Sequence, residues 1–220
     1  MHTEAFFTAL EGGYDSNFTY LIGCPKTKQL ALIDCSVPMP LIEQGVQQAQ
    51  KQGYLNISKV FLTHAHADHV AFLQPVNEKY QPAIYAHRWE FDRIKKLTGI
   101  ELQNFINPDD TLELGEEKIH CLHTPGHQPS CICFVWRNKI FTGDTLFVEG
   151  CGRCDFPESS YDEQLESLRF IANCLPNELE VHPGHNYGSI PYSTIGREKI
   201  TNRYLIGLLN EEFDVQQAQD

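Results

Sequence analysis

Four residues of metal-binding type stand within six positions of one segment. The stretch "THAHADH" (63–69) holds His64, His66, Asp68 and His69. Imidazole suits zinc, iron and similar ions, and a carboxylate adds charge neutralisation. The apolar run "KVFL" directly before the cluster predicts a short buried strand. The pattern therefore predicts a loop that presents ligands, on both sides of a turn, to two adjacent metals at the edge of a sheet.

Three further ligand-type residues follow predicted strands later in the chain. His127 in "HTPGHQ" and His185 in "VHPGHNYG" each stand in a Pro-Gly turn, and Asp144 ends the strand-like "IFTGD". Pro and Gly supply tight turns where strands end. Because four such sites are unlikely to arise together by chance, the sequence predicts a two-metal centre at a shared edge.

Strands and helices must bring these residues together, and their patterns predict a mixed α/β chain. Apolar alternation and turn signals predict strands at 5–10, 17–23, 29–35, 59–64, 82–86, 118–124, 130–136, 139–144 and 178–185, the last ending in a turn. Helix-period patterns cover 40–53, 71–80, 87–97, 160–175 and 193–209. This order favours mixed sheets covered by helices. We expect one catalytic domain, 1–210, followed by an acidic tail, 211–220.

Composition excludes several classes of function. The 220 residues carry a net charge of −12, which opposes binding to nucleic acid or to anionic membranes. No apolar run is long enough to span a bilayer, and no export signal is evident, so we expect a cytoplasmic protein. The eight cysteines are then expected to be reduced. "CGRC" (151–154) has the spacing of a redox motif, but its Gly-rich context favours a structural or site-lining role.

The motifs "THAHADH", "PGH", "TGDTLF" and "HPGH" resemble those of the metallo-β-lactamase superfamily, and the resemblance covers nearly the whole chain. It implies the metallo-β-lactamase fold, a four-layer αββα sandwich (α/β, or α+β) with the metals at one edge of two sheets. It implies that one metal takes His64, His66 and His127, that the second takes Asp68, His69 and His185, and that Asp144 bridges the pair. It also implies that Asp34 orients the histidine loop.

Two such metals predict a hydrolase. Two cations a few ångströms apart lower the pKa of a bridging water, so that hydroxide forms near neutral pH and can attack a carbonyl carbon. Asp68 and Asp144 are the expected catalytic carboxylates beside this hydroxide. The chain has no G-x-S-x-G motif, so a serine nucleophile is not indicated. We expect two divalent ions, with zinc as the default and iron or manganese as alternatives.

The branch of the superfamily is indicated by "GDTLFVEGCGR", "CDFP" and "GHNY", which look like glyoxalase II, a thioester hydrolase acting on hydroxyacyl-glutathione. Arg153 matches a basic residue and Tyr187 a tyrosine that hold glutathione in that family, whereas Asp155 replaces a second tyrosine. The sequence shows one predicted helix after His185 instead of the family's additional helical domain. We therefore expect a compact thioesterase whose carrier is glutathione, coenzyme A or an acyl carrier protein.

Two alternatives remain open. "YDSNFTYLI" and "GCGR" followed by "DF" also resemble the persulfide dioxygenases, in which a single iron would be held here by His64, His127 and Asp144. A non-catalytic binding protein is the other alternative, although such decay usually removes ligands and none is missing. Whether Arg153 contacts substrate or Asp155, and whether the chain forms a homodimer, also stay open.

Overall fold

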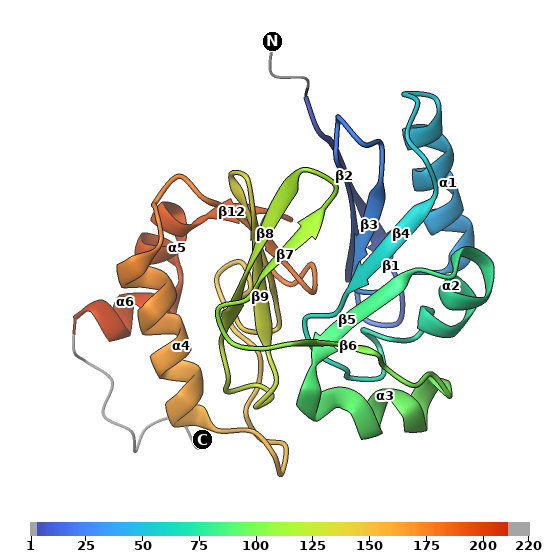
Figure 1. Ribbon diagram of the computed structural model, residues 1–220. Helices are drawn as coiled ribbons and strands as arrows, with labels where there is room; N and C mark the ends of the chain where they lie inside the picture. The colour runs from blue at the N-terminus through green and yellow to red at the C-terminus, as the bar shows by residue number, and fades with distance from the viewer. Residues whose placement is uncertain (1–3, 211–220) are drawn as a thin grey trace.

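Two six-stranded sheets face each other at the centre of the molecule (Figure 1). The computed structural model describes residues 4–210. The first sheet contains β1 (Phe6–Gly12), β2 (Asn17–Gly23), β3 (Leu30–Ile33), β4 (Ile57–Phe61), β5 (Ala83–His87) and β6 (Asn104–Ile106), in that spatial order. The second contains β12 (Ser193–Thr194), β11 (Glu180–Pro183), β10 (Lys139–Gly143), β9 (Ile132–Trp136), β8 (Glu117–His123) and β7 (Thr111–Leu114).

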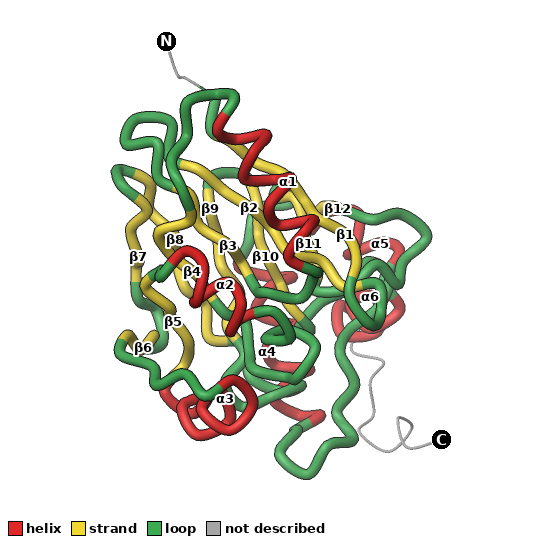
Figure 2. Tube along the Cα trace, turned by 90° about the vertical axis from the view of Figure 1, so that its right-hand side faces the viewer, coloured by secondary structure: helices red, strands yellow, loops and turns green. Residues whose placement is uncertain are grey.

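Helices cover both outer surfaces and complete four layers, which Figure 1 and the rotated view in Figure 2 show. On the first sheet lie α1 (Met39–Gln50), α2 (Leu73–Tyr80), the 3-10 turn η1 (Arg88–Glu90) and α3 (Phe91–Thr98). On the second lie α4 (Tyr161–Cys174), α5 (Ile195–Thr201) and α6 (Arg203–Leu209). The predicted αββα sandwich is confirmed.

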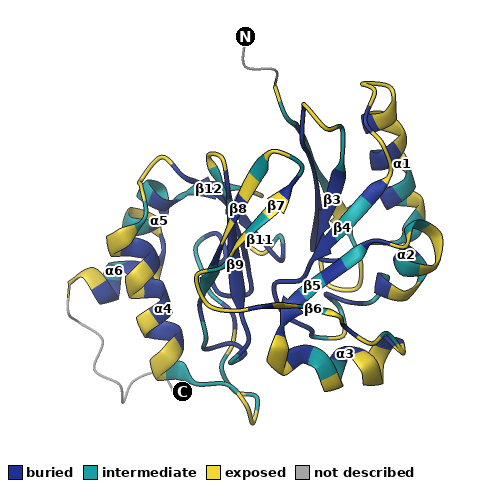
Figure 3. Ribbon diagram, viewed as in Figure 1, coloured by how far each residue is buried: buried dark blue, intermediate teal, exposed yellow. Residues whose placement is uncertain are grey.

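Burial follows the layers, because each helix turns its apolar side to a sheet (Figure 3). Strand β2 shows how one strand serves two cores: Phe18 and Tyr20 pack between the sheets, whereas Leu21 packs toward the helices. Successive strand residues point to opposite faces, so a strand buried on both sides is mostly apolar. Each such large side chain contributes about 1.5–3 kcal/mol when it is fully buried.

The strand directions place several chain segments at one edge of the sandwich. Strands β3, β4, β5 and β6 run parallel, and β10 runs parallel to β11. Parallel strands end at the same edge of their sheet, so the segments after β3 and β4 lie together, as do those after β10 and β11. The segment after β8, which holds His127, ends at the same edge as that after β10, because both strands run antiparallel to β9. All the ligand-type residues predicted above therefore belong to segments at this edge.

The closing helix predicted at 193–209 is wrong in two respects: Ser193–Thr194 form the short strand β12, and the remainder is two helices, α5 and α6. Asn202 separates α5 from α6 with an extended backbone, φ −83° and ψ 115°. Its side chain accepts a hydrogen bond from Tyr204 N and donates to the backbone oxygens of Phe147 and Gly150. The break therefore caps α6 and fastens it to the loop after β10. The short strands β6 and β7 were not predicted.

The expected acidic tail, 211–220, lies outside the described residues, so the domain boundary at 210 stays a prediction. None of the described helices has the length and apolar character that crossing a bilayer requires.

Candidate metal centre

The histidine loop joins β4 to α2 and is fixed from below by Asp34. This buried residue follows β3 with a left-handed φ of 57°. Its carboxylate accepts hydrogen bonds from Thr63 N (2.8 Å) and Thr63 Oγ1 (2.7 Å), and lies 2.9 Å from His69 Nδ1. The loop thus has its shape set by a buried charge from a neighbouring strand, with its imidazoles directed to the sheet edge.

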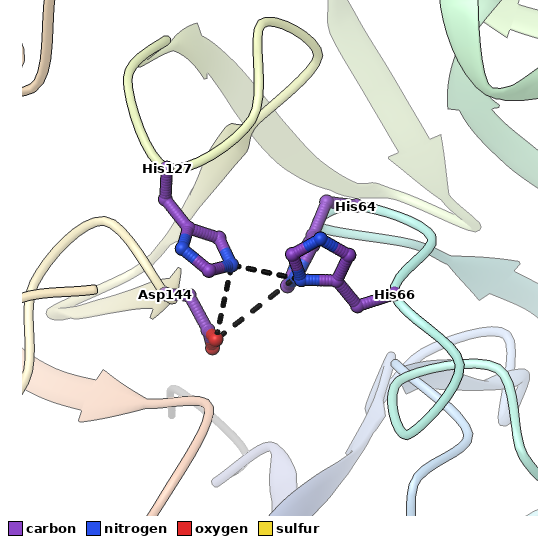
Figure 4. Close-up of side chains that lie close together, drawn as sticks. All are labelled: His64, His66, His127 and Asp144. Atoms are coloured by element: carbon purple, nitrogen blue, oxygen red, sulfur yellow. Dashed lines mark hydrogen bonds and ion pairs between the residues drawn. The ribbon is translucent and has the colours of Figure 1, made fainter. Parts of the chain in front are cut away.

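Three histidines from two segments form the first ligand cluster (Figure 4). His66 Nδ1 lies 3.1 Å from His64 Nε2 and 2.9 Å from His127 Nε2. In Figure 4 the three rings and Asp144 converge on one point. Together with Asp144, the ligand atoms of this cluster lie within 4.8 Å of one another.

The second cluster lies beside the first and contains Asp68, His69 and His185. His69 Nε2 is 3.3 Å from His185 Nε2, and Asp68 Oδ2 is 3.3 Å from His185 Nε2 and 3.6 Å from His69 Nε2. Asn17 at the start of β2 donates to the same Asp68 oxygen at 2.8 Å. The aspartate is therefore held in place from the opposite side.

Asp144 stands between the two clusters, immediately after β10. Its Oδ2 atom is 3.4 Å from both His127 Nε2 and His185 Nε2, and its Oδ1 atom is 3.1 Å from His69 Nε2. Oδ1 is buried and has no hydrogen-bond partner of good geometry among the described residues. A Cβ on Gly184 would lie 2.5 Å from this oxygen, so only glycine leaves room for the carboxylate.

These distances fit metal ions. In a tetrahedral site with metal–nitrogen bonds of about 2.0–2.1 Å, the ligand atoms lie about 3.3 Å apart. The ring nitrogens on the far side have their own partners: His127 Nδ1 faces Arg153 O at 2.7 Å, and His185 Nδ1 faces Asp15 O at 2.8 Å. Such partners fix the tautomer and leave the other nitrogen free for a metal. The donor set and the unpartnered buried oxygen both suit two cations.

The charge states agree with this assignment. Burial lowers the pKa of His64 well below its usual value, the pKa of His66 to about 4, and the pKa of His127, so these rings are neutral ligands near pH 7. Burial also acts on His69, but the carboxylates of Asp144 and Asp34 outweigh it and raise the pKa of that ring. The carboxylates around the second cluster therefore favour a positive charge there, as a bound cation would supply.

The turns that carry the later ligands are held by α4. His127 N donates to Gln164 Oε1 at 2.9 Å, and Gln164 Nε2 donates to Thr145 O at 2.7 Å. Gly126 precedes the ligand with φ 143°, and a Cβ there would lie 2.3 Å from Gln164 Cα. One buried glutamine therefore fixes the positions of both His127 and the segment after Asp144.

A cavity of about 610 Å³ opens above both clusters. Ligands form its floor, and aromatic side chains form much of its wall: Phe147, Phe156, Tyr187 and Tyr204. The ring of Phe156 packs against His66 and His127, with centroids 4.8 and 5.6 Å away.

Both residues expected to bind substrate, Arg153 and Tyr187, line this cavity. Arg153 contacts Asp155 through two guanidinium nitrogens and lies over the Phe156 ring, 4.9 Å from its centroid. Tyr187 stacks on His185, is 50% exposed, and donates its hydroxyl to Asp15. The contact between Arg153 and Asp155, left open by the sequence, is present.

The cysteines of "CGRC" are not set up for redox chemistry. Burial raises the pKa of Cys151 to about 11 and the pKa of Cys154 to about 12. A reactive thiol needs a lowered pKa, because the thiolate is the nucleophile. These shifts agree with the structural or site-lining role expected from the sequence, and Cys151 lines the cavity.

Several residues of the site were not predicted from the sequence. Asn17, Asp15 and Gln164 hold ligands or wall residues, and Arg203 and Tyr204 line the cavity from α6. The side-chain partners Asn17 and Gln164 contact segments 51 and 37 positions away in sequence. No local pattern marks such contacts.

The family model for the metallo-β-lactamase superfamily matches residues 12–185. The chain belongs to this superfamily, whose members bind metals, and its cavity floor carries two groups of His and Asp side chains that could hold metal ions.

Relatives with different activities are about equally similar to the chain. A probable polyketide biosynthesis zinc-dependent hydrolase, PksB of Bacillus subtilis, is 30% identical over 82% of this chain and 77% of its own length. A probable hydroxyacylglutathione hydrolase of Schizosaccharomyces pombe is 29% identical (90% and 75%), and the human mitochondrial persulfide dioxygenase ETHE1 is 30% identical (89% and 74%). The crystal structure of ETHE1 from Myxococcus xanthus superposes with a TM-score of 0.79 at 27% identity, covering 95% of this chain and 92% of that one.

Proposed function

We propose that this protein is a metal-dependent hydrolase that cleaves a thioester. The observation that carries the proposal is the complete pair of ligand clusters joined by Asp144 on the floor of one cavity. The similarity to PksB and to the hydroxyacylglutathione hydrolase supports hydrolysis, and the latter supports a thioester. Zinc is the proposed metal, since PksB is described as zinc-dependent.

When bound, two divalent cations supply a hydroxide at neutral pH and polarise the carbonyl oxygen. The residues of the chain hold and neutralise that centre. His64, His66 and His127 provide neutral nitrogens, whereas Asp68 and Asp144 provide negative charge.

Asp68 is the carboxylate best placed to handle a proton. Its side chain is 28% exposed, the bridging Asp144 is nearly buried, and interaction with His69 and Asn17 outweighs burial to lower the pKa of Asp68. It is therefore ionised at neutral pH and lines the cavity. In the reaction, a water oxygen bonds to the acyl carbon and the C–S bond breaks. The water's proton passes by way of Asp68 to solvent or to the departing thiolate.

The persulfide dioxygenase stays the second candidate, because the similarity to ETHE1 is as high as that to the hydrolases. A single iron would use His64, His127 and Asp144. His66 distinguishes the two proposals, because only the hydrolase would use it as a ligand. Its Nδ1 atom lies 3.1 Å from His64 Nε2 and 2.9 Å from His127 Nε2.

The first experiment compares metal content and activity in protein purified without oxygen or chelators. About two metals per chain and hydrolysis of S-lactoylglutathione or acetyl-coenzyme A would support the proposal. One iron per chain, with oxygen uptake on glutathione persulfide, would overturn it.

A variant sharpens this result. His66→Ala should abolish hydrolysis and remove one metal per chain, whereas a mononuclear iron enzyme should keep its metal. His120→Ala is the matched control, since His120 is exposed on β8 and its side chain hydrogen-bonds only to Thr111 among the described residues.

A further inference from the structure

Two guanidinium groups line the cavity, and they differ in their partners. Arg153 is neutralised by Asp155. Arg203, the first residue of α6, donates from Nη2 to Tyr204 Oη at 2.7 Å, and its guanidinium carbon lies 4.7 Å from the Tyr204 ring centroid. Among residues 4–210, no carboxylate forms an ion pair with Arg203, although it belongs to the same cavity wall.

The carboxylates that line this cavity are already engaged. Asp15 accepts from Tyr187, and Glu149 pairs with Arg197 at 2.5 Å. Asp68 and Asp144 face the metal-ligand histidines. Arg203 is thus a permanent positive charge at the cavity wall, and no carboxylate within residues 4–210 neutralises it.

The position of Arg203 is fixed by the residue before it. Asn202 Nδ2 donates to Gly150 O at 2.9 Å and to Phe147 O at 3.3 Å, and both of those residues line the cavity. Tyr204, which follows, also lines the wall. The guanidinium therefore sits on an anchored backbone over an aromatic ring, an arrangement that keeps its planar fork oriented.

We propose that Arg203, supported by Tyr204, binds an anionic group on the thiol portion of the substrate. An arginine fork binds a carboxylate or a phosphate with two parallel hydrogen bonds. Both groups occur on thiol carriers: a carboxylate on a peptide-type thiol and a phosphate on a pantetheine-type thiol. The inference rests on the proposed thioester hydrolysis and makes Arg203 a specificity-determining residue of that same site.

The test uses the full chain loaded with its metals and three thioesters: S-acetylglutathione, acetyl-coenzyme A, and the uncharged S-acetyl-N-acetylcysteamine. In Arg203→Met, the ratio of kcat/KM for the preferred anionic thioester to that for the uncharged one should fall about 10- to 100-fold, mainly through KM. Loss of one charge-assisted contact has this magnitude. Arg203→Lys should recover part of the ratio, because it keeps the charge without the fork.

Arg169→Met is the matched control, because Arg169 is an exposed arginine of α4 that does not line the cavity. It should leave the ratio unchanged. A larger loss with the glutathione ester identifies a carboxylate as the anion, and a larger loss with the coenzyme A ester identifies a phosphate. An Arg203→Met variant whose ratio equals that of the wild type overturns the inference, as does an equal loss on all three substrates.

Failure of the proposed function gives a different result. If the wild type hydrolyses none of the thioesters, calorimetric titration with free glutathione and with coenzyme A still measures the anion contact. Weaker binding to Arg203→Met than to the wild type then supports the subsite, and equal or undetectable binding to both proteins overturns it.

Discussion

The floor and the mouth of the cavity are built on different principles. On the floor, ligands follow strand ends, and residues such as His69 and His185 have hydrogen-bond partners behind them. At the mouth, Arg153 has 67% of its side chain exposed and Tyr187 is half exposed. Strand ends hold catalytic groups in a fixed geometry, which preserves the reaction. Exposed residues on the surrounding loops and on α6 can be replaced without disturbing that geometry, so they can adapt the site to different substrates. We infer that this floor serves hydrolysis and that the mouth selects the thiol.

The largest effect should follow from breaking the centre of the floor. Asp144→Ala removes the carboxylate shared by both clusters, so metal content should fall from two per chain to one or fewer. Its kcat/KM should fall at least about 1,000-fold, the scale seen when an electrostatic catalytic group is removed. Elemental analysis and the thioester assay check this. Asp155→Ala, at the mouth, is the control, and equal losses in the two variants would contradict the distinction between floor and mouth.

The packing beneath the cavity floor can be tested at His182. It is buried among the rings of Phe7, Tyr20 and Phe141, and its Nδ1 atom has no hydrogen-bond partner in the described part of the chain. Burial, with a contribution from Lys139, lowers the pKa of His182 to about 4.

The sign of the resulting pH dependence follows from linkage. Between pH 6.5 and 4 the unfolded state binds more protons at this position than the folded state, so stability falls as pH falls. His182→Phe should remove up to about 3 kcal/mol of the loss between pH 7 and pH 4. Urea unfolding of metal-free protein measures it, with exposed His120→Phe as the control. A wild-type slope in His182→Phe would show that this ring does not titrate as its burial implies.

Removing the support under the histidine loop should have an intermediate effect. Asp34→Asn keeps the size and tolerates the left-handed backbone, but removes the charge facing His69. Loss of such a partner lowers metal affinity or activity about 10- to 100-fold. Competition with a chromogenic chelator measures the affinity. An affinity equal to that of the wild type would mean that the loop holds its shape without this carboxylate.

The smallest effect is expected from Arg153, because Asp155 already neutralises its guanidinium. Arg153→Ala should change kcat/KM for an anionic thioester by no more than about fivefold. In the Asp155→Ala background, where the guanidinium has lost its partner, the same substitution should cost more. A double-mutant cycle measures the difference. A large loss of kcat/KM from Arg153→Ala alone would contradict this prediction and show that Arg153 is as important for the reaction as the residues of the floor.

The same distinction explains what the sequence could predict. The seven expected ligands were recognisable because each is a ligand-type residue in a short motif at a strand end, and both clusters form as neighbouring groups. The sandwich followed from the same motifs. Contacts such as Asn17 with Asp68 could not be predicted, because they join segments that share no local pattern.

The break at Asn202 was missed for a related reason. The helical pattern continues across it, whereas the side chain of Asn202 bonds to Phe147 and Gly150, which no local pattern predicts. The strands β6 and β7 have three and four residues, too short for alternation to stand out. No pattern in the sequence distinguishes Arg203 from a surface arginine, and only the position of α6 shows that it lines the cavity.

Each ligand cluster draws on both halves of the sandwich. His64 and His66 follow a strand of the first sheet, whereas His127 belongs to the second, and Asp68 and His69 meet His185 in the same way. Bound metal would therefore connect the two sheets at this edge. Metal-free protein lacks this link, so the two sheets should separate more often at this edge. Amide hydrogens along it should then exchange with solvent faster than those at the opposite edge.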